Sequence, residues 1–354
     1  MTARTINLQK ALSLRDQGTL LIDARTPAEF ADGTIPGAIN VPLLDNEQRH
    51  QVGSVYKQQG KAEARLLGVK LVSPHIPAMI DAVLEARTEP KQPVVVFCWR
   101  GGMRSGALTN FLNLAGIPAL QMSGGYKVFR RHVLDFFAAG SWGRLIVLRG
   151  LTGVGKTQLL QQLRADGLPV LDLEALANHR GSAFGALGLG PQPSQKQFDA
   201  LLWDAMRFIP PGAYALAEGE SRHIGRVALP KTVYAALQEE TSLWIEASLD
   251  YRVKIILDDY PALDGLKSEF IRPIEALKEK LGKEKVTEFL QLLELGEWKK
   301  LVAELMVHYY DPLYRHTCPD SAQRIDVPIE PEADGLQRLR EAIHAVLART
   351  PGQD

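Results

Sequence analysis

The sequence predicts an α/β protein with two domains, each built around a parallel sheet. Its 354 residues are enough for two ordinary domains with their own cores. Short apolar runs alternate with helix-like segments through the first third of the chain, and a second alternation begins at Arg144. Such an alternation indicates parallel strands joined by helical crossovers. We expect one domain over residues 1–137 and another over residues 138–354.

The first domain alternates strand-like and helix-like runs. The strand-like runs are residues 20–23, residues 37–42 and the β-branched stretch Val94–Phe97. The helix-like runs, in which apolar residues recur at helical spacing or follow a turn, are residues 26–31, 75–86 and 105–116. Ala119–Met122 then leads into the glycine pair Gly124 and Gly125.

The second domain follows a small, polar linker at residues 138–143. The expected strands are residues 145–148, 170–173, 214–217, 243–245 and 325–329. One helix should begin at Lys156, and residues 334–349 should form a closing helix. Between residues 250 and 316 the pattern becomes helical, with lysine and glutamate at short spacing. We therefore expect a parallel sheet combined with a helical segment.

Composition narrows the class of protein. The 41 basic and 41 acidic residues exclude a nucleic-acid coat held by overall charge, although a local basic stripe is sufficient to bind RNA. The two cysteines, Cys98 and Cys318, exclude a disulfide framework. The first twenty residues lack the apolar core of a signal peptide, and no apolar run is expected to span a bilayer. We expect a soluble, cytoplasmic protein with no membrane segment.

Cys98 is a candidate catalytic thiolate. It ends the run VVVF and is followed by WRGGMRS, whose glycines let successive N–H groups point inward as an anion-binding nest. The following helix adds its positive end, and the cations Arg100 and Arg104 also favour thiolate over thiol. This suits transfer of a sulfur, selenium or phosphoryl group, whereas the alternative is a buried structural cysteine. The expected anion cradle consists of Gly101, Gly102, Met103 and Ser105. Cys318 lacks such surroundings and is expected to be structural or merely exposed.

A phosphate-binding loop follows the strand expected at residues 145–148. The sequence GLTGVGKT is the full G-x-x-x-x-G-K-[ST] pattern in its strand–loop–helix context. Its N–H groups would cradle phosphates, Lys156 would neutralise charge, and Thr157 is a candidate Mg²⁺ ligand. The alternative is a glycine-rich turn without a ligand. The expected diphosphate-binding residues are Gly150, Thr152, Gly153, Val154, Gly155, Lys156 and Thr157.

Polar residues after two other strands predict a second part of that site. Residues 214–217 lead into EGESR, and residues 170–173 carry an aspartate followed by LEALANHR. The alternative is that these are solvated carboxylates at strand ends. For Asp172 this alternative is about as strong as a role in the site, and for Glu218 it is weaker. The candidate second-site or substrate residues are Asp172, His179, Arg180, Glu218, Glu220, Ser221 and Arg222.

Basic residues interleaved with aromatics raise the question of an RNA surface. They cluster at residues 130–132, 222–226 and 267–285, with WKK at residues 298–300 and two tyrosines at residues 309–310. Such aromatics can stack on unpaired bases. In residues 275–285, however, lysines alternate with glutamates, which is more typical of a solvated helix face.

Residues 5–135 resemble the rhodanese fold. The matching segments, in the family's usual order, are DAR at residues 23–25 with EF at 29–30, IPGAINVP at 35–42, the cysteine loop, and GGY at 124–126. The resemblance implies a structural role for Asp23 and Arg25, which tie the strand end to the loop. Common sulfurtransferase loops place their arginine five residues after the cysteine, whereas Arg104 is six residues after Cys98. Rhodanese-like phosphatases share that longer loop, which would also fit selenium or selenophosphate.

Nearly the whole chain is similar to the tRNA 2-selenouridine synthase family. The segments that carry this similarity are CWRGGMRS, the phosphate loop, residues 172–182 and residues 218–225, in that order. The resemblance implies an N-terminal rhodanese-like domain fused to a C-terminal P-loop NTPase-like domain.

The resemblance also implies a reaction. The protein would bind tRNA with 2-thiouridine at the wobble position and replace its sulfur with selenium from selenophosphate. Geranyl diphosphate would first alkylate the sulfur, so that it leaves as a geranyl thiol. The phosphate loop would hold the diphosphate, and Cys98 would serve the selenium step as a carrier or by orienting the donor. No tightly bound cofactor is expected; Mg²⁺ and a selenophosphate-supplying enzyme are candidate partners.

Three other functions fit parts of the sequence. An ATP-dependent small-molecule kinase fused to a sulfurtransferase would turn over ATP without tRNA. A rhodanese-like phosphatase is favoured by the spacing between Cys98 and Arg104. A non-catalytic sulfur or selenium carrier would be inactive by itself on thiolated tRNA.

Overall fold

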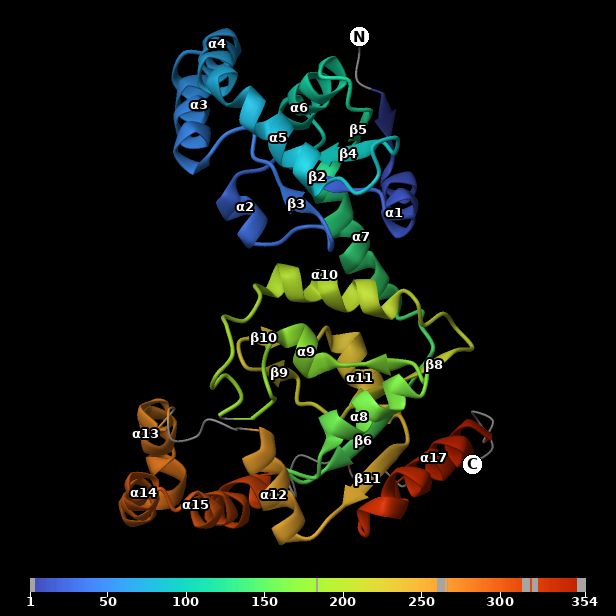
Figure 1. Ribbon diagram of the computed structural model, residues 1–354, viewed down its shortest axis with the longest axis vertical. Helices are drawn as coiled ribbons and strands as arrows, with labels where there is room; N and C mark the ends of the chain where they lie inside the picture. Colours follow the sequence, from blue (N-terminus) through green and yellow to red (C-terminus); the bar gives the residue numbers. More distant parts are fainter. Residues whose placement is uncertain are drawn as a thin grey trace. The chain divides into compact units, whose positions relative to one another are not determined.

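The structure, a computed structural model, describes residues 4–182, 184–259, 265, 267–313, 319 and 324–348, so Cys318 lies outside the described residues. The chain forms two compact units (Figure 1). The first comprises Met1–Ala139 and Ser194–Asp204, and the second comprises Gly140–Pro193 and Ala205–Asp354. Both are α/β with parallel sheets, which confirms the predicted fold class.

The first unit contains a five-stranded parallel sheet with the order β1-β5-β4-β2-β3. Its strands are β1 (Thr5–Ile6), β2 (Leu21–Asp23), β3 (Ile39–Asn40), β4 (Val94–Phe97) and β5 (Ala119–Met122). The central strand is β4, which is buried along its whole length because helices cover both of its faces. Cys98 follows it directly, at the carboxyl edge of the sheet.

Helices surround this sheet (Figure 1). They are α1 (Leu8–Asp16), α2 (Pro27–Ala31), α3 (Asn46–Gln58), α4 (Lys61–Val72), the 3₁₀ turn η1 (Ser73–His75), α5 (Ile76–Ala86), α6 (Met103–Leu114) and α7 (Gly125–Ala139). Val83 of α5 and Leu108 of α6 pack against Val96 of β4, so these two helices cover one face. Helices α3 and α4 were not expected from the sequence.

One stretch of the first unit bears on the expectation that no apolar run spans a bilayer. Lys61–Ala86, which spans α4, η1 and α5, is long and apolar enough to cross a membrane by length and composition, and an 18-residue window within it has a mean hydropathy of 1.3. A single such stretch is weak evidence for a membrane segment. Pro74 and Pro77 interrupt it, and part of its apolar surface lines the cavity described below.

Helix α10 (Gln195–Met206) contributes most of its residues to the first unit, although the sequence boundary after residue 137 placed it in the second domain. Arg130 of α7 pairs with Asp199 at 2.7 Å. Trp203 is buried and packs edge-on against Phe129, with 5.2 Å between ring centroids. These contacts join segments far apart in the chain, and for that reason the boundary could not be read from local pattern.

The second unit contains a five-stranded parallel sheet with the order β12-β11-β6-β8-β7. Its strands are β6 (Arg144–Gly150), β7 (Val170–Leu171), β8 (Tyr214–Glu218), β11 (Ser242–Glu246) and β12 (Arg324–Pro328); an antiparallel pair is formed by β9 (His223–Ile224) and β10 (Val227–Ala228). Each of the five expected strand runs contains a strand, although the run at residues 170–173 ends as a strand at Leu171 and Leu173 begins α9. The phosphate loop follows the central strand β6.

The helices of the second unit fall into two groups. Those packed with the sheet are α8 (Lys156–Ala165), α9 (Leu173–Ala177), α11 (Lys231–Glu239) and α17 (Glu332–Ala348). The others, in the expected helical segment, are α12 (Leu249–Asp259), α13 (Lys267–Ala276), α14 (Lys278–Leu295), α15 (Trp298–Leu305) and η3 (Met306–Tyr310). This segment has its own core, which includes Phe289, Tyr309 and Tyr310. The two tyrosines are therefore buried rather than displayed for stacking on RNA.

The start of α7 fits closely against the cysteine loop. The amide of Tyr126 donates a hydrogen bond of 2.8 Å to the carbonyl of Cys98. Gly125 has a φ of +59°, and a Cβ there would collide with the Cys98 carbonyl oxygen and lie 2.5 Å from the amide nitrogen of Gly101. Only glycine allows this approach of two backbones.

Gly125→Ala should therefore destabilise the first unit strongly. Gly116 is the matched control, because its φ is +80° but a Cβ there meets no atom within 4 Å. We expect Gly116→Ala to lower the free energy of unfolding by about 1–2 kcal/mol, from backbone strain alone. Gly125→Ala should cost about 2–5 kcal/mol, because the collision adds to that strain. Urea unfolding of the full chain measures both, and equal losses would contradict the close approach.

Candidate functional site

Cys98 lies buried at the end of β4, with the following loop folded around its sulfur. The amide nitrogen of Gly102 is 3.3 Å from Sγ, and the hydroxyl of Ser105 is 3.2 Å from it. Helix α6 begins at Met103, so its positive end adds to the same place. Of the predicted cradle residues, Gly102 and Ser105 thus contact the sulfur, where they would stabilise negative charge.

Gln121 on β5 holds this loop in shape. Its side-chain amide donates to the carbonyl oxygens of Gly101 at 2.8 Å and Gly102 at 3.0 Å. A peptide group is planar, with N–H and C=O pointing in opposite directions. Pulling the Gly101 carbonyl towards Gln121 therefore turns the Gly102 N–H towards Cys98. Gln121 could not be identified from the sequence, because nothing in a strand pattern marks a side chain that holds a distant loop.

The two predicted arginines have different surroundings. Arg104 pairs with Glu29 through both carboxylate oxygens, at 2.5 and 3.2 Å. Burial raises the pKa of Glu29, but the hydrogen bonds and charge of Arg104 outweigh it and hold this pKa below its usual value. Arg100 is exposed beside the cysteine loop. Arg104 is thus tied to a carboxylate, whereas Arg100 faces solvent.

A buried ion pair lies next to the start of α7, which packs against the cysteine loop. Arg25 and Asp23 are almost fully buried and lie 2.6 Å apart. Asp23 also accepts from the hydroxyl of Thr34 at 2.8 Å, and the Arg25 guanidinium lies 3.9 Å from the centre of the Tyr126 ring. This pair links β2 to the start of α7, in keeping with the structural role implied for the two residues.

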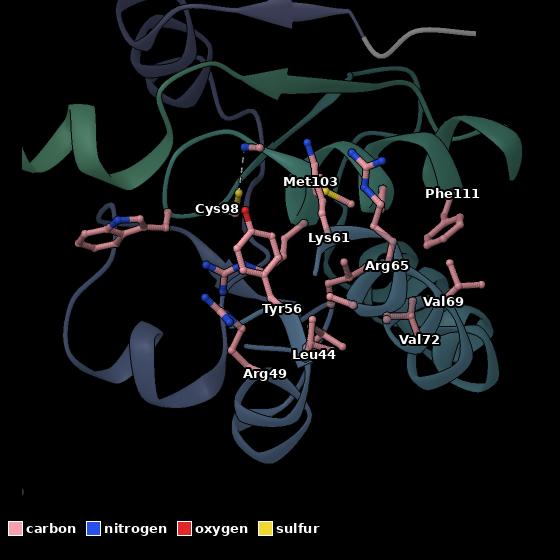
Figure 2. Close-up of a pocket in the computed structure, with 18 of the residues that line it drawn as sticks. Leu44, Arg49, Tyr56, Lys61, Arg65, Val69, Val72, Cys98, Met103 and Phe111 are labelled. Atoms are coloured by element: carbon pink, nitrogen blue, oxygen red, sulfur yellow. Dashed lines mark hydrogen bonds between the residues drawn. The ribbon is translucent and has the colours of Figure 1, made fainter. Parts of the chain in front are cut away.

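Cys98 opens into a large cavity of about 840 Å³ (Figure 2). The labelled side chains in Figure 2 converge on this space, with Cys98 at one end and Val69 and Phe111 at the other. Its walls come from α3, α4 and α6 and from the residues after β3. The helices that the sequence analysis missed therefore form much of the surroundings of the thiol.

The phosphate loop of the second unit has the backbone that its pattern requires. Gly153 and Gly155 have φ values of +83° and +79°, and α8 begins at Lys156. A Cβ on Gly153 would lie 2.7 Å from the Arg252 carbonyl oxygen, so the loop is packed tightly against α12. The Thr152 hydroxyl is buried and has no hydrogen-bond partner among the described residues. A ligand in the loop would supply one.

Three glutamates gather beside this loop. Thr157 Oγ1 donates to Glu174 at 3.2 Å. A Cβ on Gly181 would lie 2.8 Å from a Glu174 oxygen and 2.6 Å from a Glu220 oxygen, so these two carboxyls are near neighbours. Glu218 is fully buried, and one of its oxygens accepts from the amide of Leu173 while the other has no partner among the described residues.

Burial and mutual repulsion raise the pKa values of these carboxyls. The pKa of Glu174 rises to about 7, chiefly through burial and then through the charge of Glu220, against the opposing effect of Lys156. Burial raises the pKa of Glu218 well above its ordinary value, and burial also raises that of Glu220. The cluster can therefore hold protons near neutral pH or attract a cation.

The remaining predicted residues lie around this cluster with different roles. Asp172 caps α9, accepting from the amide of Ala175 at 2.9 Å. His179 is buried, and burial lowers its pKa; Arg180 donates to the Leu187 carbonyl at 2.7 Å. Ser221 and Arg222 are exposed. Glu174 was not among the candidates, although it is two residues after Asp172 and directly follows the same strand region.

The raised pKa of Glu174 predicts a pH-dependent stability. Its folded pKa of about 7 exceeds its ordinary value of 4.5, so its contribution is fully present below pH 4.5 and is lost as pH rises through 7. The unfolding free energy of the wild-type chain should fall between pH 5 and pH 8. In Glu174→Gln this fall should be smaller, by on the order of 2 kcal/mol. Urea unfolding at both pH values measures this. The exposed Glu269→Gln is the control, and the same pH dependence in both variants would contradict the argument.

Comparison with known proteins agrees with this arrangement. The family model described as "tRNA 2-selenouridine synthase AAA domain" matches residues 143–342, and the model for the rhodanese-like domain matches residues 7–132. A tRNA 2-selenouridine synthase of Marinobacter nauticus is 36% identical, covering 88% of this chain and 92% of that protein. One from Bdellovibrio bacteriovorus is 32% identical, with 89% and 93% covered. The chain belongs to the tRNA 2-selenouridine synthase family.

Proposed function

We propose that this enzyme replaces the sulfur of wobble 2-thiouridine in tRNA with selenium in two steps, through an S-geranyl intermediate. The observation that carries the proposal is the pairing of two anion sites on one chain. One surrounds the Cys98 sulfur with N–H groups, and the other is a phosphate loop with Lys156 at its helix start. A selenium donor that bears phosphate and an alkyl donor that bears diphosphate each need such a site.

The first step belongs to the phosphate loop. The 2-thio sulfur attacks C1 of geranyl diphosphate, the C1–O bond breaks, diphosphate leaves, and the base releases its N3 proton. Negative charge grows on the leaving oxygens as the bond breaks. The loop N–H groups and Lys156 would stabilise that charge, and the unpaired Thr152 hydroxyl is available as a further donor.

The chemistry of the loop also fits Mg²⁺. In phosphate sites this ion is usually held by one or two protein ligands together with phosphate oxygens and waters. Thr157 and Glu174 would hold it, and the ion would neutralise diphosphate charge. The described residues contain no group of three or more His, Cys, Asp or Glu suited to a metal. The bound diphosphate would therefore have to complete the coordination.

The second step belongs to Cys98. Selenium from selenophosphate attacks C2 of the modified base, the C2–S bond breaks, and the sulfur leaves as geranyl thiol after taking up a proton. Water then receives the phosphoryl group and releases phosphate. Cys98 would orient the donor for this attack, with the Gly102 N–H and Ser105 placed to stabilise the negative charge of its sulfur. We expect this reaction to occur in the cytoplasm, where tRNA and a selenophosphate supplier would be available to the enzyme.

Cys98→Ser should abolish selenation and leave geranylation largely intact, because the thiol and the phosphate loop lie in different units. The measurement is mass spectrometry of wobble nucleosides after incubation with thiolated tRNA, geranyl diphosphate and selenophosphate. The expected product is S-geranyl-2-thiouridine without 2-selenouridine. Equal loss of both steps in a folded variant would refute this division of labour.

Lys156→Ala should slow geranylation about a hundredfold or more, since losing one such electrostatic contact costs roughly 3 kcal/mol of barrier. Selenation of chemically pre-geranylated tRNA should change much less, because that step releases no diphosphate. The measurement is two rates for the variant and the wild type: geranylation of thiolated tRNA with geranyl diphosphate, and selenation of pre-geranylated tRNA with selenophosphate. If both fell equally, the loop would serve tRNA or nucleotide binding; ATP turnover without tRNA would instead favour a kinase.

A further inference from the structure

We propose that the cavity beside Cys98 holds the isoprenoid chain of the S-geranylated nucleotide during selenation. This inference rests on the proposed function, and it assigns the binding site of the leaving group. The proposed chemistry needs the C2–S bond close to Cys98, so the chain attached to that sulfur must lie within a short distance of the thiol. The 840 Å³ cavity that includes Cys98 is the space available there.

The walls of the cavity are mainly apolar. The aliphatic and aromatic side chains that line it are Leu43, Leu44, Val52, Val69, Val72, Ile76, Met103 and Phe111. Leu44 and Val72 are buried and form part of the core of the first unit. A volume of this size lies within the range of about 300–1,000 Å³ typical of small-molecule sites. It has room for a ten-carbon chain and part of a nucleoside.

Several side chains that line the cavity are exposed to solvent, and a bound ligand would cover them. Val69 is 66% exposed, Met103 is 60% exposed and Tyr56 is 57% exposed. They belong to three different helices, α4, α6 and α3, yet all face the same cavity (Figure 2). Apolar side chains gathered at a concave surface mark a binding site, whereas scattered ones need no explanation. An apolar chain laid between the helices would cover them.

Positive charge surrounds the apolar walls. The exposed cations Arg49, Lys61, Arg65 and Arg100 line the cavity, and none of the four has an ion-pair partner within the described residues. Exposed cations around an apolar space fit an occupant with an apolar tail and an anionic body. A prenylated nucleotide in RNA has both, because its chain is apolar and its backbone carries phosphates.

Free geranyl diphosphate shares that chemistry, but the position of the thiol favours the nucleotide. Diphosphate departs in the first proposed step, for which the phosphate loop of the second unit is suited. Cys98 serves the second step, in which the group that leaves is geranyl thiol. The cavity would therefore bind the geranyl chain while selenium attacks C2. Afterwards it would hold the released geranyl thiol away from the base.

The inference predicts a dependence on chain length. Each methylene buried strengthens binding about fourfold, so a ten-carbon chain should bind much more tightly than a five-carbon chain. The test uses anticodon stem-loop RNA that carries S-geranyl-2-thiouridine or S-dimethylallyl-2-thiouridine. Dissociation constants come from fluorescence anisotropy, and the KM and kcat of selenation come from nucleoside analysis. The wild-type chain should prefer the geranyl RNA at least tenfold in both binding and KM.

Two lining positions have matched controls on the same helices. Val69→Asp places a charge in the cavity, and Leu66→Asp places one on the same helix at a residue that is 65% exposed and does not line it. Phe111→Ala removes an aromatic side chain from the end of the cavity far from Cys98. Leu114→Ala changes a residue that is 88% exposed and lies outside the cavity. Val69→Asp and Phe111→Ala should lose the preference for the longer chain, and the two controls should keep it.

The outcomes separate this inference from the proposed function. If the wild-type chain selenates geranylated RNA, but its chain-length preference survives both cavity variants, the inference is wrong and the proposed function stands. If the wild-type chain neither geranylates nor selenates, the proposed function fails. If Val69→Asp raises the KM for free geranyl diphosphate as much as it weakens binding of geranylated RNA, the cavity holds the donor instead, which also overturns the inference.

Discussion

Parallel pairing decides where chemistry can occur in this chain. All strands of each five-stranded sheet run in the same direction, so the loops that follow them gather at one edge. In the first unit the loop after the central strand β4 carries Cys98, and in the second the loop after β6 carries the G-x-x-x-x-G-K-[ST] pattern. Both loops also lead into the N-terminus of a helix, α6 or α8, which favours anions. The chain thus has the same strand–loop–helix arrangement twice, once in each unit.

The two units treat buried charge differently. In the first, the Asp23–Arg25 pair is fully buried, and its hydrogen bonds to Thr34 and to the backbone compensate for lost solvation. In the second, Glu218 has an oxygen without a partner among the described residues, and burial raises the pKa values of all three clustered glutamates. Buried carboxyls with raised pKa values or without a hydrogen-bond partner are typical of functional sites, because a ligand can supply the missing interaction.

Elements with a strong local signal could be predicted closely. Val94–Phe97 is a strand with the expected bounds, because an uninterrupted β-branched and aromatic run before a glycine-rich loop has few other stable conformations. Helices α3 and α4 were missed, since their exposed faces dilute the apolar pattern. The partnership of Arg104 with Glu29 was missed as well, because the two residues are 75 positions apart and only the fold brings them together.

The sequence by itself determined the two α/β patterns, the glycine-containing loop after Cys98, the P-loop sequence pattern and the resemblance to a selenouridine synthase. These depend on residue types at short spacing, which act through local backbone geometry. Only the tertiary structure decided that α10 joins the first unit, that Glu174, Glu218 and Glu220 meet, and that α3 and α4 build an apolar cavity beside Cys98. Each of these depends on the packing of segments distant in sequence, which local pattern does not specify.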